Sequence, residues 1–273
     1  MVLENKNAIV YGAGGSLGAA VATAFAAAGA RVFLTGRTLS SVQKTAASFL
    51  AAGGRAEAAV VDALDEKAID GHLERVVQKA GTLDISFNAA GVDLVQNIPL
   101  TDISMADFIQ PITYTMQTRF LTAIAAAKVM MKQGSGIILT LTATPGGIGY
   151  PYTGGFAPTC AAVEALSRNL AAELGPYSVR VVNIRSGGSP DSRVFKEAID
   201  SNPEAMKTVL QSMEKDTMLK KLPLMADIAN VAVFLASDLS GKITGVTIDV
   251  TAGTTAGLNY RAPAHHQLNP RTV

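Results

Sequence analysis

The stretch that decides the fold is Asn7-Ala-Ile-Val-Tyr11, followed directly by Gly12-Ala-Gly-Gly-Ser-Leu-Gly18. The first five residues form a short apolar run, which predicts a buried strand. The glycines predict a tight turn after it. Apolar residues then recur at helical spacing from Leu17 to Ala28, so a helix follows the turn.

A glycine-rich turn between a strand and a helix suits the pyrophosphate of a dinucleotide. Glycines let the backbone approach the phosphates, and the amides at the start of the next helix attract their charge. A glycine cluster alone also fits a tight turn that needs positive φ. The position of this cluster, between a first strand and an amphipathic helix, favours dinucleotide binding.

The rest of the chain repeats the same alternation. Strands are predicted at 31–35, 58–61, 83–87, 137–142, 179–184 and 246–250, and helices at 39–52, 66–80, 161–174, 228–236 and in a long segment ending near Met131. Strands that alternate with helices predict a parallel sheet covered on both faces. We therefore expect a single-domain α/β fold, a Rossmann-like doubly wound sheet over 1–256, with 257–273 as a surface arm or subunit contact.

Composition limits the partners. The 273 residues are 48% hydrophobic, and 23 basic against 22 acidic residues give a net charge of +1. A chain with almost no net charge is not expected to bind nucleic acid or a membrane surface. A small molecule is the expected partner. The single Cys160, the lack of a signal-peptide pattern and the lack of a long apolar run predict a cytoplasmic protein without a membrane span. No metal is expected.

These motifs together resemble the short-chain dehydrogenase/reductase family over nearly the whole chain. The family's Thr-Gly-x-x-x-Gly-x-Gly corresponds to Tyr11 through Gly18, and its Asn-Asn-Ala-Gly segment to Asn88 through Gly91. Tyr11 and Ser16 depart from the pattern. The hydroxyl of Ser16 either bonds a phosphate oxygen or narrows the approach to it.

The residue after the second strand indicates which cofactor fits. Gly36-Arg37 stands where the family places an acidic residue on the ribose 2′-hydroxyl of NAD. A guanidinium there suits a 2′-phosphate, so NADP(H) is favoured over NAD(H). The alternative is a solvated surface arginine.

Further cofactor contacts are implied by the resemblance. Asp62 matches an adenine-contacting residue, although it also suits a helix cap, and Asn88 also suits a turn. The predicted cofactor-binding residues are Gly12, Gly14, Gly15, Ser16, Leu17, Gly18, Arg37, Asp62, Ala63, Asn88, Ala90 and Gly91.

The resemblance fails where the family keeps its catalytic groups. The Tyr and Lys positions fall on Phe156 and Cys160, the Ser position on Ala143 and the upstream Asn position on Thr115. Phe156 has no ionisable proton, and a thiol does not replace an ammonium. The usual proton relay is therefore not expected. Cys160 has no evident His partner, so a small buried hydrophobe is favoured over a nucleophile.

Another donor remains in the loop 146–155, which holds Tyr150 and Tyr152. Enoyl reductases of the same superfamily space their Tyr and Lys differently, and hydride addition to an enone needs a donor to the oxyanion. We predict Tyr152 as the first candidate, assisted by Thr142 or Thr144. The alternative is that these aromatic side chains only line a pocket wall.

Beyond the sixth strand, Ser192 or Asp191 is expected to contact the nicotinamide amide. The segment 190–222 carries Met206, Met213 and Met218, which fit either a mobile substrate lid or ordinary helix packing.

Three functions follow as hypotheses. The first is an NADP(H)-dependent oxidoreductase with an atypical proton donor, acting on a small apolar carbonyl or enone. The second is a catalytically silent relative, a sensor or partner subunit, that still binds the nucleotide. The third is a non-redox lyase or isomerase in the same pocket. The resemblance also implies a homo-oligomer, a dimer or tetramer.

Overall fold

The computed structural model describes residues 1–51 and 53–257. Seven parallel strands form one sheet in the order β3-β2-β1-β4-β5-β6-β7. The strands are β1 (Asn7–Tyr11), β2 (Arg31–Gly36), β3 (Arg55–Val60), β4 (Ile85–Asn88), β5 (Gly136–Ala143), β6 (Val179–Ser186) and β7 (Thr247–Val250). The predicted fold class, a single-domain Rossmann-like doubly wound sheet, is confirmed.

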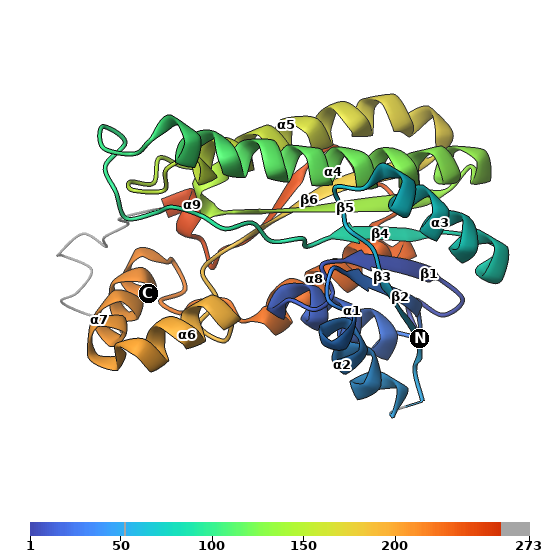
Figure 1. Cartoon of the computed structure of the whole chain (residues 1–273), viewed down its shortest axis with the longest axis horizontal. Coiled ribbons are helices and arrows are strands. Elements are labelled where there is room, and N and C mark those ends of the chain that lie inside the picture. Colours follow the sequence, from blue (N-terminus) through green and yellow to red (C-terminus); the bar gives the residue numbers. More distant parts are fainter. Residues whose placement is uncertain (52, 258–273) are drawn as a thin grey trace, which may run out of the picture.

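Helices cover both faces of the sheet. They are α1 (Ser16–Ala27), α2 (Leu39–Leu50), α3 (Glu66–Ala80), α4 (Met105–Gln133), α5 (Phe156–Leu174), α6 (Arg193–Ser201), α7 (Pro203–Asp216), α8 (Met225–Ala236) and α9 (Thr254–Gly257). Figure 1 shows α3, α4 and α5 on one face and α1, α2 and α8 on the other, with α6 and α7 beyond the edge of these layers.

The core has one apolar layer on each face. Successive residues of β1 alternate between them: Ala8 and Val10 pack into the layer of α1, α2 and α8, whereas Ile9 and Tyr11 pack into the layer of α3, α4 and α5. This alternation follows from the two-residue period of a strand. Burial on both sides explains why β1 reads as a continuous apolar run.

Most predicted boundaries lie within three residues of the observed ones, and the largest difference is at the start of α5. Helix α5 begins at Phe156, five residues before the predicted start at Ala161. Pro158 separates the two starting points, yet it lies in the first turn of the helix. A proline is tolerated there because the N–H groups of that turn have no intrahelical acceptor.

Strand order places the site. β1 lies between β2 and β4, so the chain order reverses beside it, and ligands of such sheets bind at the carboxyl ends of the strands at this point. Residues 258–273 of the predicted C-terminal arm lie outside the described part. Among the described helices, none has the length and apolarity to cross a membrane.

Candidate functional site

A crevice of about 610 Å³ opens at the carboxyl ends of β1, β2 and β4. Its wall contains eleven of the twelve residues that the sequence assigns to the cofactor: Gly12, Gly14, Gly15, Ser16, Leu17, Gly18, Arg37, Asp62, Ala63, Ala90 and Gly91. Residues from four separate loops therefore meet at one edge of the sheet.

The backbone of the glycine loop fits a closely approaching phosphate group. Gly12 has a φ of +73°, and a Cβ at this position would lie 2.7 Å from the backbone of Ala89 and Ala90. A Cβ on Gly18 would overlap the carbonyl of Gly12. Helix α1 starts after Gly15 with no side-chain cap and no acidic residue in its first turn. Its first amides are therefore suited to an anion.

Arg37 is an exposed cation in the wall of the crevice. It follows β2, lines the crevice and is exposed. Within the described residues it forms no ion pair. Ser41 lines the crevice as well and adds a hydroxyl. The charge and the hydroxyl fit the donor set that a phosphate monoester requires.

Asp62 and Asn88 have different positions. Asp62 lines the crevice, and its Oδ1 accepts a 3.0 Å hydrogen bond from the Leu64 N–H. Asn88 is buried and is absent from the crevice wall. Its Nδ2 donates to the Thr122 hydroxyl at 2.8 Å, and its Oδ1 accepts from the Ala90 N–H at 2.8 Å. Asn88 thus supports the wall from behind.

The two departures in the glycine motif, Ser16 and Tyr11, differ in their hydrogen bonding. The Ser16 hydroxyl accepts a 2.9 Å hydrogen bond from the N–H of Arg193. Tyr11 is fully buried, and its hydroxyl has no partner among the described residues. Burial, with a smaller contribution from Asp70, raises the pKa of Tyr11, so the phenol stays neutral.

A second cavity of about 430 Å³ adjoins the crevice. The two share four lining residues, Leu17, Ser192, Val194 and Met225. The second cavity is mostly apolar, and Asp216 is the one charged side chain in its described wall. The crevice of the glycine loop therefore meets a smaller cavity suited to an apolar molecule.

Of the three predicted catalytic residues, Thr144 lines the second cavity, whereas Tyr152 and Thr142 do not. Tyr152 is 56% exposed, has a φ of +60° and does not line the second cavity. Tyr150 does line it, and burial, followed by the charge of Asp216, raises the pKa of Tyr150. Thr144 lines the cavity and donates to the Ser186 carbonyl at 3.3 Å. Thr142 is buried and donates to Glu164 at 3.0 Å.

Helix α5 carries Phe156 and Cys160 in its first two turns. Phe156 lines the second cavity, whereas Cys160 is 2% exposed. Burial raises the pKa of the Cys160 thiol to about 11, so the thiolate is scarce at neutral pH. Cys160 behaves as a small buried side chain.

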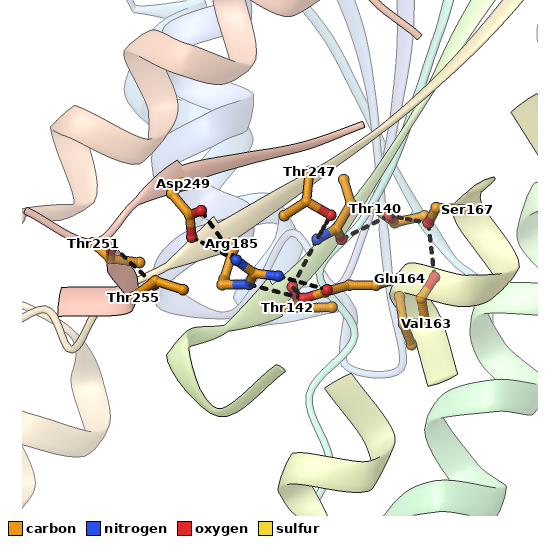
Figure 2. Close-up of polar contacts among 11 residues, drawn as sticks. Thr140, Thr142, Val163, Glu164, Ser167, Arg185, Thr247, Asp249, Thr251 and Thr255 are labelled. Atoms are coloured by element: carbon orange, nitrogen blue, oxygen red, sulfur yellow. Dashed lines mark hydrogen bonds and ion pairs between the residues drawn. The ribbon is translucent and has the colours of Figure 1, made fainter. Parts of the chain in front are cut away.

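Arg185 is the centre of an ionic network between the buried Glu164 and the exposed Asp249 (Figure 2). The Arg185 guanidinium donates to Glu164 at 2.9 and 2.6 Å and to Asp249 at 2.9 and 3.0 Å. Hydrogen bonding to Glu164 is the main reason why the pKa of Arg185 is raised. The network joins α5 to the carboxyl ends of β6 and β7.

The segment predicted as a lid forms two helices, α6 and α7. Met213 lines the second cavity. Ser192 lines both cavities and caps α6, while Asp191 accepts hydrogen bonds from the Met225 N–H at 3.1 and 3.2 Å. Of the two residues predicted to contact the nicotinamide, Ser192 lines the cavities and Asp191 does not.

Sequence analysis missed several polar residues of the site. They are Arg119 in α4, the Glu164–Arg185 pair, Asp216 at the end of α7, and Ser189, whose buried hydroxyl has no partner among the described residues. A usable signal existed for two of them. Arg119 and Arg185 are charges inside otherwise buried segments, and such charges are rarely buried without a role.

Comparisons with known proteins agree with this geometry. The family model described as Enoyl-(Acyl carrier protein) reductase matches residues 12–255. The 7alpha-hydroxysteroid dehydrogenase of Escherichia coli (strain K12) is 30% identical over 259 residues, covering 94% of this chain and 97% of that protein. Levodione reductase of Leifsonia aquatica is 28% identical over 251 residues, covering 91% and 93%.

Solved structures give the same result. The crystal structure of levodione reductase superposes with a TM-score of 0.85 at 25% identity, covering 93% of this chain and 99% of that one. NAD+-bound xylitol dehydrogenase superposes with a TM-score of 0.86 at 26% identity, covering 93% and 100%. The chain belongs to the short-chain dehydrogenase/reductase family of oxidoreductases.

Proposed function

We propose that this chain is an NADP(H)-dependent oxidoreductase that reduces a small, largely apolar carbonyl or enone. The observation that carries the proposal is the meeting of two cavities at Leu17, Ser192, Val194 and Met225. One has the glycine loop and Arg37 in its wall, and the other is apolar. When bound, the cofactor supplies a hydride, and this junction is where a substrate would receive it.

Cofactor binding is assigned to residues of the crevice. The amides that begin α1 and the backbone around Gly12 would hold the diphosphate, and Arg37 would pair with a 2′-phosphate. Asp62 would accept a hydrogen bond from the adenine end. The preference for NADP(H) rests on Arg37, because a guanidinium without an ion pair among the described residues is available to that phosphate.

The donor to the substrate oxygen is assigned to Tyr150, the neighbour of the predicted Tyr152. Tyr150 lines the second cavity, and its raised pKa keeps the hydroxyl protonated, as a hydrogen-bond donor to a developing oxyanion must be. Thr144 lies in the same wall and would assist. We propose that the segment 190–222 acts as the lid of this cavity.

The test is the rate of NADPH oxidation across a panel of enones and ketones. Tyr150→Phe is expected to lower kcat by about 100-fold, the usual effect of removing one oxyanion donor. Tyr152→Phe serves as the matched control and should retain the rate. A rate that falls in the Tyr152 variant and persists in the Tyr150 variant would return the role to Tyr152.

A catalytically silent role is the second candidate. It is favoured by Phe156 and Cys160, which bring neither an acid nor a cation to the first turns of α5. Tight NADPH binding without turnover of any member of the panel would support it.

We also infer a homo-oligomer, a dimer or tetramer. Phe120 on α4 and Phe234 on α8 are exposed apolar side chains on the two faces of the molecule, and partner copies on these faces would cover them (Figure 1). Light scattering at several protein concentrations measures the assembly. The lone free Cys160 fits a reducing compartment such as the cytoplasm.

A further inference from the structure

Arg119 is a buried cation without an acidic partner. It lies on α4 and is 5% exposed. Its guanidinium donates to the Oδ1 of Asn88 and, at 3.3 Å, to the carbonyl of Ala90. No ion pair involves it in the described part of the chain, and its Nε has no hydrogen-bond partner there.

A charge in this environment is costly to the fold. Burial lowers the pKa of Arg119 to about 10, so the side chain remains charged at neutral pH. Neutral acceptors, an amide and a carbonyl oxygen, satisfy part of its hydrogen bonding but do not cancel its charge. The electrostatic field of a buried charge that lacks a counter-ion is weakly screened, so it affects other charges nearby.

Arg119 is in direct contact with one cavity wall, and its charge reaches a residue next to the other. On one side it holds Ala90, which lines the dinucleotide crevice. On the other side its charge acts on the thiol of Cys160, which lies against the backbone of Ala143. Ala143 lines the second cavity. The guanidinium therefore lies behind the wall of the dinucleotide crevice, and its charge reaches a residue that is bonded to the wall of the second cavity.

We propose that Arg119 makes this site bind the reduced cofactor more tightly than the oxidised one. The inference rests on the proposed function, because hydride transfer requires the nicotinamide ring to lie where the two cavities meet. The reduced ring is uncharged and the oxidised ring carries a positive charge, which a fixed guanidinium repels. The chain is thus built to hold NADPH and to release NADP+, as a reductase requires.

The expected size follows from Coulomb's law. Two unit charges about 10 Å apart, in a surrounding with an effective dielectric constant of about 20, change an affinity by roughly tenfold or somewhat more. Arg119 acts through this field and through its contacts with Asn88 and Ala90, so it is a positioning residue.

Calorimetric titration with NADPH and with NADP+ separates this role from a structural one. The wild-type protein should bind NADPH about tenfold more tightly than NADP+. Arg119→Met should bring the two dissociation constants to within about threefold of each other. Arg119→Lys keeps the charge and should keep most of the preference. Lys128→Met removes an exposed cation from the same helix and should change nothing.

Loss of packing alone would weaken both forms of the cofactor equally, so a preference that survives in a folded Arg119→Met protein would overturn the inference. If that variant does not fold, the wild-type ratio decides: equal affinities, or tighter NADP+ binding, would overturn it. Binding of both forms with an unchanged ratio leaves the proposed function intact. Failure of the wild type to bind either form would remove both.

Discussion

The hydroxyl of Ser16 in the glycine loop accepts a 2.9 Å hydrogen bond from the backbone N–H of Arg193, 177 residues further along the chain. Arg193 is the first residue of α6, and N–H groups at that position have no intrahelical acceptor. One side chain of the cofactor loop thus satisfies an amide of the proposed lid. A ligand that engages this loop would also affect how firmly the lid is held.

Replacing Ser16 should loosen the start of α6. In Ser16→Ala the Arg193 amide loses its acceptor, and a hydrogen bond worth about 1 kcal/mol corresponds to about fivefold faster amide exchange. Hydrogen exchange followed by mass spectrometry measures peptides from this helix. Thr23→Ala, which removes a hydroxyl that bonds only within α1, is the control. Equal exchange in wild type and Ser16→Ala would show that this bond does not restrain the lid.

The ion pair between Glu164 and Arg185 should dominate the stability of the strand ends. Both side chains are buried, and without the Glu164 charge the Arg185 guanidinium keeps only the exposed Asp249 as a counter-ion. Glu164→Gln is expected to lower the free energy of unfolding by roughly 3 kcal/mol. Urea denaturation measures it, with Glu197→Gln, from an exposed pair with Arg193, as the control. A similar small loss in both variants would contradict a structural role for the buried Glu164–Arg185 pair.

Stability should decline in mild acid because of His72. This residue is buried, its Nδ1 has no partner among the described residues, and burial lowers its pKa to about 4. Between pH 6.5 and 4 the unfolded chain binds a proton that the folded chain does not. The free energy of unfolding should therefore fall by about 2 kcal/mol from pH 7 to pH 5 on this account.

His72→Gln removes the titrating group, so its stability should depend less on pH over this range. Urea midpoints at pH 7 and pH 5 give the comparison. If the variant and the wild type lose the same stability between these pH values, His72 is not the source.

Asp216 should select against anionic substrates. It is the one charged residue in the described wall of the second cavity, and it ends α7, where the helix dipole also disfavours anions. Asp216→Asn is expected to raise kcat/KM for a carboxylate-bearing ketone by about tenfold relative to its neutral analogue. Steady-state rates with matched substrate pairs measure this, and an unchanged ratio would place Asp216 outside the substrate space.

Much of the fold was predictable because its signals are local. Helix α3 has the predicted bounds, Glu66–Ala80, since Asp65 caps its start and Gly81 follows its end. The conformation of the glycine loop was likewise predictable, because Gly12 has a positive φ and no room for a Cβ. Such features depend on neighbours in sequence.

Other parts of the site depend on packing between distant segments. Tyr150 and Tyr152 belong to one short loop, yet Tyr150 lines the cavity and Tyr152 is exposed. This difference depends on the positive φ of Tyr152 and on the surrounding helices. Asn88 lies at the predicted strand end but faces α4. The proposed role of Arg119 depends on its proximity to Ala90 and Cys160. The spacing of these residues along the chain does not predict that they lie close together.

Arg37 should determine the choice between the two nicotinamide dinucleotides. Arg37→Ala removes a charge-assisted contact worth roughly 1.5–3 kcal/mol, so the affinity for NADPH should fall by about 10–100-fold. The affinity for NADH should change little, because NADH lacks the 2′-phosphate. Lys44→Ala removes a nearby exposed cation from α2 that does not line the crevice, and it should have no such effect.

Calorimetric titration of the wild-type chain with NADPH and NADH is the most direct measurement. The crevice beside Gly12 and Arg37 predicts saturable binding at one site per chain, with NADPH bound at least tenfold more tightly than NADH. No binding of either dinucleotide, or tighter binding of NADH, would contradict the proposal that this chain holds a 2′-phosphorylated cofactor.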